Sequence, residues 1–200
     1  TVYCYNNFII GYVHMFFFQF LNNTVAGGSL STPTFHGFAG YLENNLIINP
    51  LGGTVLSAFH TKGSDYNDYY NGGNNNLAVI GSTSYNNLVD LYNATGDEQH
   101  SISHLVNFQS PTDLHLALSS LGDQQLAGIP NYLIPDDIDG DTRSFTNPYK
   151  GADEVIDFPL PVELASFTYS VNNNNVNLNW TTALELNYSG FGLERQDVSG

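Results

Sequence analysis

Short apolar runs alternate with polar turns along the first part of the chain, and the pattern recurs. Residues 16–20 and 46–48 are apolar and strand-like, and Gly-rich turns follow at residues 27–28 and 52–53. A repeat of this kind predicts stacked units, because each short unit can bury its apolar face only against its neighbours.

A pair of Asn residues precedes the apolar run of each repeat. The second members of these pairs are Asn7, Asn23 and Asn45, which are separated by 16 and 22 residues, and the segment 65–70 forms a degenerate fourth copy. This spacing is typical of one coil of a parallel β-helix plus a variable loop. We therefore predict a structural role for the three Asn residues, which would lie at equivalent bends and hydrogen-bond to one another in a ladder.

The pattern changes after the repeats. Apolar residues at helical spacing over residues 88–92, followed by Gly96, predict one short helix. An alternation with a period of two over residues 101–108 and 113–118 predicts that the stacked strands then continue. An acidic stretch that ends at Glu154 closes this part of the chain. We place the first domain at residues 1–158 and predict for it a parallel β-helix with a C-terminal closing segment.

Residues 159–200 show a different pattern. Pro159 and Pro161 stiffen the connection, and three strand-like segments follow around Trp180, for which a structural role is expected. These segments predict an incomplete β-sandwich, so the fold class expected for the whole chain is all-β. Three strands cannot close a sandwich, and an open edge and apolar face need a cover. We therefore expect self-association through this module.

Charge excludes several partners. Only 4 Lys and Arg residues oppose 19 Asp and Glu residues, which gives a net charge of −15. Nucleic acid and anionic membranes would therefore be repelled. The apolar segment 8–21 is shorter than the roughly 20 residues of a spanning helix, so buried strands and no membrane insertion are expected. With Cys4 as the single cysteine, an intrachain disulfide is excluded.

Several segments resemble those of a known type of bacterial surface protein. Residues 64–70, 94–97, 112–116 and 137–154 are similar to right-handed parallel β-helix surface proteins of the pectate-lyase-like superfold. Residues 161–195 resemble the fibronectin type III-like module that often follows such helices in proteins exported by the type IX secretion route. The resemblance implies an extracellular or cell-surface location. It leaves function open, because this superfold serves lyases, hydrolases, adhesins and structural fibres alike.

Residues suited to catalysis are scarce. A pectate-lyase-like reaction needs a calcium ion beside a basic residue, and the first domain contains only Lys62, Arg143 and Lys150 as Lys and Arg residues. Asp65 and Asp68 are the best local pair for glycoside hydrolysis, but a polar turn in an Asn- and Asp-rich segment is the explanation we favour. We therefore assign no catalytic residue and expect no enzyme activity.

The acidic stretch allows a metal site or an ion pair. Three alternating carboxylates would suit a calcium ion: Asp137, Asp139 and Asp141. In the other interpretation, which we favour, Arg143 pairs with Asp153 or Glu154 and clamps the end of the domain without a cofactor.

Aromatic residues in a polar segment suggest a carbohydrate contact. The candidates are Tyr66, Tyr69 and Tyr70. The function we expect is that of a secreted or cell-surface structural or adhesive protein, with a self-assembling extracellular fibre component as one form of it. Two alternatives remain open: a fragment of a polysaccharide lyase or glycoside hydrolase whose catalytic coils lie elsewhere, and a carbohydrate-binding surface module.

Overall fold

The computed structural model describes residues 2–16, 18–73, 76–154, 163–173, 175–184 and 192. The chain divides into two compact units, Thr1–Ile156 and Asp157–Gly200, where the sequence analysis placed the division after residue 158. Both units are built mainly of β-strands. Among the described residues, no helix has the length and apolar character needed to cross a membrane.

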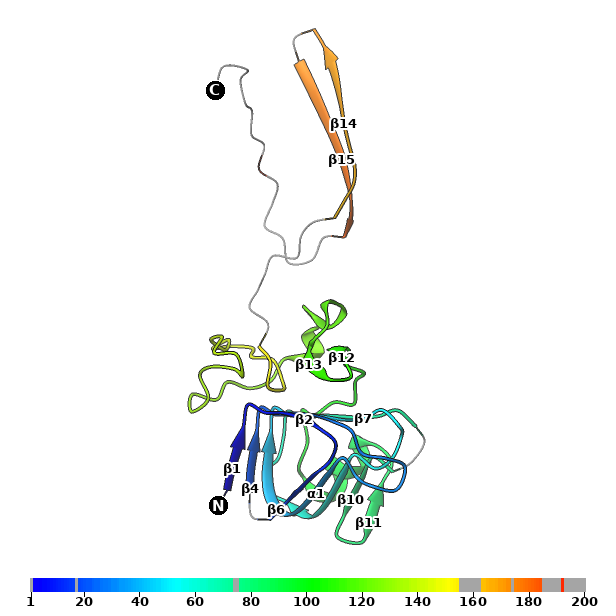
Figure 1. Ribbon diagram of the computed structural model, residues 1–200, viewed down its shortest axis with the longest axis vertical. Helices are drawn as coiled ribbons and strands as arrows, with labels where there is room; N and C mark the ends of the chain where they lie inside the picture. The colour runs from blue at the N-terminus through cyan, green and yellow to red at the C-terminus, as the bar shows by residue number, and fades with distance from the viewer. Residues whose placement is uncertain are drawn as a thin grey trace. The chain divides into compact units, whose positions relative to one another are not determined.

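Two sheets form the main part of the first unit, and the chain passes back and forth between them (Figure 1). One sheet has the order β1 (Val2–Tyr5), β4 (Phe18–Leu21), β6 (Phe35–Glu43), β8 (Leu56–Thr61), β10 (Ala78–Ile80) and β11 (Thr83–Tyr85), and β3 (Val13–Met15) also pairs with β6. The other has the order β2 (Phe8–Ile10), β5 (Thr24–Ala26), β7 (Leu46–Asn49) and β9 (Asp68–Asn71). Neighbouring strands are parallel except in the β10–β11 pair.

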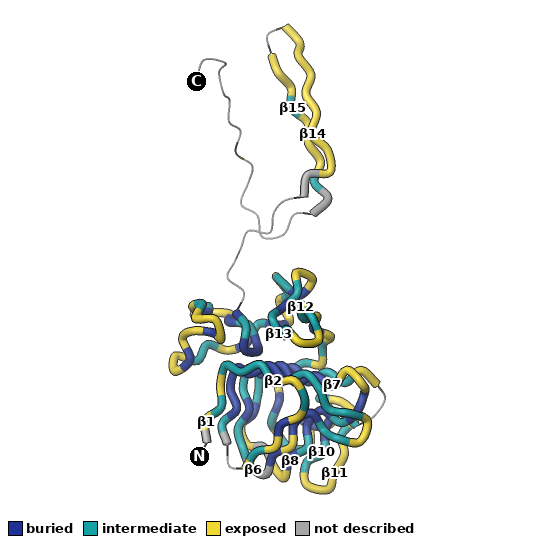
Figure 2. The backbone as a smooth tube through the Cα atoms, viewed as in Figure 1, coloured by how far each residue is buried: buried dark blue, intermediate teal, exposed yellow. Residues whose placement is uncertain are grey.

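The β2-β5-β7-β9 sheet is covered on both of its faces. Ile47 of β7 packs with Phe20 and Phe35 in the core between the two sheets. Leu46 and Ile48 belong to a second apolar cluster with residues of the later segment that follows α1. Because successive side chains of a strand point to opposite faces, all four residues of β7 are buried (Figure 2).

The predicted short helix is confirmed as α1 (Leu88–Thr95). The side chain of Asn87 caps its first turn by accepting a hydrogen bond from the backbone N–H of Asp90. Gly96 ends the helix in the left-handed conformation, with φ of 77°, which costs a residue without Cβ little.

The predicted continuation of the stacked parallel strands after α1 is wrong. Strands β12 (Phe108–Ser110) and β13 (Asp113–Leu116) form an antiparallel pair instead, and two short 3₁₀ turns follow at Leu118–Ser120 and Gln124–Leu126. Period-two alternation reports a half-buried strand but does not identify its partner. Here Leu116 and Leu126 pack in one apolar cluster with Leu46 and Ile48 of β7.

The second unit contains one described hairpin. Strands β14 (Glu163–Asn172) and β15 (Asn175–Leu184) pair in antiparallel fashion, and Trp180 lies opposite Phe167. The predicted third strand at residues 191–196 lies outside the described residues apart from residue 192. The described part of this unit is therefore a two-stranded hairpin and not the expected β-sandwich.

Candidate functional site

A hydrogen-bonded ladder of Asn side chains runs through the stacked bends. Nδ2 of Asn7 donates to Oδ1 of Asn23 over 2.8 Å, Asn23 donates to Asn45 over 3.3 Å, and Asn45 donates to Asn67 over 2.9 Å. The backbone N–H groups of Asn7, Asn23 and Asn45 each donate to the same acceptor as their own side chains. Each amide therefore satisfies polar groups of the neighbouring bend that would otherwise be buried without a partner.

The ladder ends at a buried acid that the sequence analysis did not identify. Oε2 of Glu98 accepts hydrogen bonds from Asn67 Nδ2 over 3.0 Å and from Ser101 Oγ over 2.5 Å, and Oε1 accepts from the hydroxyl of Tyr69 over 2.9 Å. Burial raises the pKa of Glu98 to about 7 against the opposing effect of these hydrogen bonds. Glu98 has a positive φ of 67°. The residues around it in the sequence show no apolar pattern that would predict its burial.

The first Asn of each pair makes the sharp bend that precedes the ladder. Asn6, Asn22 and Asn44 have φ between 50° and 56°, in the left-handed region that Asn tolerates better than most residues. Asn44 also holds the later segment, since it donates to the carbonyl of Ile129 over 2.6 Å and accepts from its N–H over 2.9 Å. The doubled Asn was the signal that could have identified these positions.

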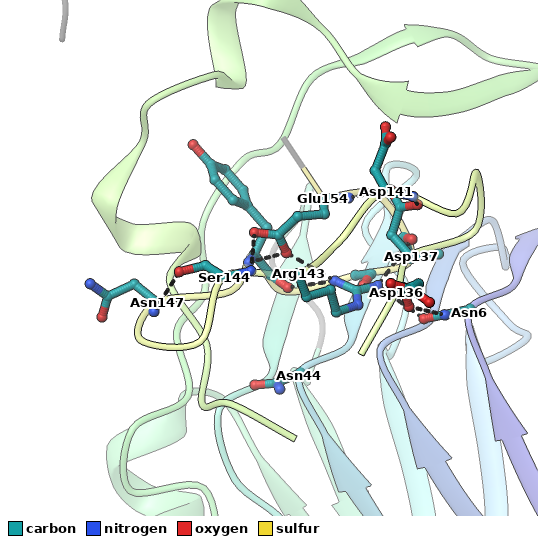
Figure 3. Close-up of polar contacts among 12 residues, drawn as sticks. Asn6, Asn44, Asp136, Asp137, Asp141, Arg143, Ser144, Asn147 and Glu154 are labelled. Carbon is teal, nitrogen blue, oxygen red and sulfur yellow. Dashed lines mark hydrogen bonds and ion pairs between the residues drawn. The ribbon is translucent and has the colours of Figure 1, made fainter. Parts of the chain in front are cut away.

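Arg143 lies at the centre of the closing segment, residues 127–154 (Figure 3). Its guanidinium donates from Nη1 to Oε2 of Glu154 over 3.2 Å and from Nη2 to Oδ1 of Asn6 over 2.9 Å. The guanidinium also donates to the backbone carbonyls of Tyr149, Gly151 and Ala152. Burial lowers the pKa of Arg143 and raises that of Glu154. The buried ion pair thus holds the closing segment together, and the hydrogen bond to Asn6 ties the segment to the first bend.

The three alternating aspartates have separate partners. Asp137 is buried, and its Oδ1 accepts from the N–H groups of Asp139 and Asp141 while its Oδ2 accepts from the N–H of Glu154 (Figure 3). The side chain of Asp139 instead hydrogen-bonds to His115, with 2.8 Å between Oδ2 of Asp139 and Nε2 of His115. Asp137 therefore organises the turn as a backbone acceptor, and the described geometry does not bring the three carboxylates together around one point.

His115 joins the β13 strand to the closing segment. Its Nδ1 hydrogen-bonds to Asp113 and its Nε2 to Asp139, and the ring of Phe8 contacts it edge-on. Burial lowers the pKa of His115, but the hydrogen bonds to the two carboxylates raise it above its usual value. In the described part of the chain, His115, Asp139 and Asp153 are the residues whose potential metal ligands approach one another within 4.8 Å. Since carboxylates already engage both ring nitrogens, the arrangement is a complete ion-pair network.

Asp153 was the other expected partner of Arg143. Its Oδ2 accepts from the backbone N–H of Leu116 over 2.7 Å, so it anchors β13 while Glu154 pairs with the guanidinium. The pKa of Asp153 is raised by burial.

The three tyrosines proposed as carbohydrate contacts do not form a surface cluster. Tyr69 is 1% exposed and donates to Glu98, so its assignment as a contact is wrong. Tyr66 stacks on His100, and Tyr70 packs against the second apolar cluster. The cause is strand geometry: Tyr69 and Tyr70 are neighbours on β9 and therefore face opposite sides of the sheet.

Asp65 and Asp68 likewise have different environments. Asp65 lies 2.7 Å from Nδ1 of His100, whereas Asp68 is buried and its Oδ1 accepts from the N–H of His104. Burial raises the pKa of Asp68 to about 7. A carboxylate pair of this kind lacks a shared open face for a glycosidic bond.

No family model, curated protein or solved structure matches this chain. The resemblance to pectate-lyase-like β-helix surface proteins with a fibronectin type III-like module, exported by the type IX route, is therefore corrected. The described residues form a mainly β protein with parallel and antiparallel sheets, and no family match supports an assignment to those surface proteins.

Proposed function

We propose that this protein is a structural or adhesive scaffold that works outside the cell or at its surface, and that the parallel strands of residues 2–80 are the coils of a short solenoid. The observation that carries this proposal is the continuous ladder from Asn7 to Glu98. A ladder of buried amides holds successive coils in one register, because a slip would leave several polar groups without partners.

Rigidity is the property that such a construction supplies. The core between the sheets and the cluster outside β7 immobilise the β2-β5-β7-β9 sheet from both faces. The closing segment is tied to the bends by Asn6 and Asn44. A rigid stack suits a spacer or fibre component better than an enzyme that must open and close around a substrate.

Self-association is the partner interaction we propose, through the hairpin of the second unit. Exposed apolar side chains on this hairpin include Phe167, Tyr169, Val171 and Val176. A ladder of apolar residues on an exposed two-stranded sheet is a surface for strand or sheet packing by a second copy. The net charge of −15 opposes this association, and salt would weaken the opposition.

The test uses the whole chain. Sedimentation velocity over a wide concentration range, at low and high salt, should show assembly that salt promotes, and electron microscopy should show extended particles. Incubation with acidic polysaccharides, with and without Ca²⁺, should give no cleavage. A chain that stays monomeric at every concentration and salt level, or that cleaves these polymers, would contradict the proposal.

A further inference from the structure

An apolar groove of about 460 Å³ lies within the first unit. It is lined by residues at the ends of β5 and β7, by the segment 105–111 that leads into β12, and by Leu114 of β13. Its volume falls in the range of roughly 300–1,000 Å³ that is typical of pockets for small organic molecules. None of its twelve lining residues is Asp, Glu, Lys, Arg or His.

A small residue in the β2-β5-β7-β9 sheet makes room for the groove. Ile10, Ala26, Ile48 and Tyr70 lie in register across the four strands. The neighbour of Ala26, Val25, belongs to the core between the two sheets, so Ala26 points to the opposite face of its sheet. Because Ala26 is the smallest member of this row, the face recedes between its larger neighbours.

The accessible walls of the groove are apolar. Leu105 is 52% exposed, and Ala26 and Phe108 are partly exposed, so these side chains present apolar surface that a ligand can reach. Asn107 and Gln109 are exposed lining residues, and their amides can donate and accept hydrogen bonds. The groove therefore combines apolar walls with uncharged polar groups open to solvent.

Size and charge define the occupant. A stable protein interface takes about 20–30 residues from each side, and the groove has twelve, so it fits a small molecule better than a protein partner. A charged ligand would lose water without gaining an opposite charge from the lining residues. An anion would also be repelled by the net charge of −15. The groove thus favours a neutral ligand that is mainly apolar.

We propose that the groove walled by Ala26, Leu105 and Phe108 binds a neutral amphiphilic small molecule. Its apolar body lies against these three side chains, and its uncharged polar group hydrogen-bonds to the amide of Asn107 or Gln109. This binding site goes beyond the scaffold role proposed above and does not depend on it.

The experiment titrates the full chain with N-phenyl-1-naphthylamine, a neutral dye whose fluorescence rises in apolar surroundings. We expect saturable binding at one site per chain. 1-Octanol should displace the dye at a concentration about tenfold or more below that of octanoate, which has the same chain length and a negative charge. Absence of saturable binding would overturn the proposal, and so would displacement by octanoate at the same or a lower concentration.

Variants locate the bound dye. Leu105→Asp places a charge in the accessible wall and should weaken binding about tenfold or more, whereas Leu133→Asp, at an exposed position outside the groove, should leave it unchanged. Ala26→Leu fills the gap in the row and should also weaken binding. Phe167→Asp tests the exposed apolar side chains of the hairpin and should have no effect.

The urea midpoint of each variant reports its folding. Because Leu105 is exposed, Leu105→Asp tests the groove even if Ala26→Leu proves unstable. Binding that neither groove variant weakens, or that Phe167→Asp abolishes, would place the dye elsewhere and overturn the proposal. Assembly and polymer cleavage are measured separately, so failure here leaves the scaffold proposal standing on its own results.

Discussion

Removal of one rung of the Asn ladder should destabilise the protein strongly. Asn45 is fully buried, and its Nδ2 donates to the carbonyl of Phe20 over 2.7 Å and to Oδ1 of Asn67 over 2.9 Å. Its Oδ1 accepts from the backbone N–H of Asn23 over 2.9 Å. Asn45→Ala would leave that N–H and the carbonyl of Phe20 without these partners in a place that water cannot reach.

The magnitude follows from those two groups. A buried polar group that loses its partner costs about 1–3 kcal/mol, so we expect Asn45→Ala to lower the free energy of unfolding by about 2–6 kcal/mol. That is a large part of the roughly 5–15 kcal/mol that stabilises a typical domain. Urea unfolding followed by far-UV circular dichroism measures the loss.

The matched control is Asn86→Ala, because Asn86 is exposed and should change stability by no more than about 0.5 kcal/mol. Asn45→Asp is a second probe, since it keeps the shape and loses the donor. At neutral pH it should be nearly as damaging as Asn45→Ala, and it should recover at acid pH, where a protonated carboxyl can donate again. A loss below about 1 kcal/mol for Asn45→Ala would refute the view that the ladder holds the stacked bends together.

Three further predictions concern a buried acid, a buried ion pair and a close backbone approach. The pKa of Glu98 is raised from 4.5 to about 7 in the folded protein, so the folded state holds a proton that the unfolded state releases, and the contribution of Glu98 to stability should fall as pH rises through that window. Urea midpoints across this range should show a shallower decline in Glu98→Gln, and an unchanged slope would contradict the assignment. Arg143→Met should cost about 3–5 kcal/mol because Glu154 stays buried without a cation, and the double variant with Glu154→Gln should recover part of the loss; equal losses in the two would show that the charge is not the cause. Gly53→Ala would bring its Cβ to 1.7 Å from the carbonyl oxygen of Ser29 and should lower the thermal midpoint far more than Gly140→Ala, whose Cβ meets nothing within 4 Å and bears only the backbone strain of a φ of 89°; similar midpoints would mean that the backbone at Gly53 yields easily.

Structural features that depend on a few consecutive residues could be inferred from the sequence. The helix over 88–95 is one, because apolar spacing and Gly96 are local signals. The doubled Asn at each bend is another: a left-handed residue followed by an amide is a local requirement, and its recurrence marks the repeat. The mainly β character follows in the same way from short apolar runs between turns.

Tertiary structure decided which residues meet. Strands β12 and β13 are antiparallel because only two residues join them, but the packing of Leu116 with Leu46 and Ile48 of β7 depends on how the segment folds back. The sequence does not distinguish Tyr69 from Tyr66 and Tyr70, but in the structure its hydroxyl donates to Glu98, which is 29 residues further along the chain. The pairing of His115 with Asp139 and of Arg143 with Asn6 is equally remote in the chain.

The physical reason is that sequence pattern reports the burial of one side of an element, whereas a site depends on what packs against that side. Asn6, Asn22 and Asn44 adopt the same backbone bend for the same local reason. Their side chains differ because the closing segment returns to contact Asn6 and Asn44, whereas the amide of Asn22 has no hydrogen-bond partner within the described residues. The sequence by itself determined the bends, and the return of a segment that lies 85 to 137 residues further along the chain determined which of these bends gains a side-chain partner.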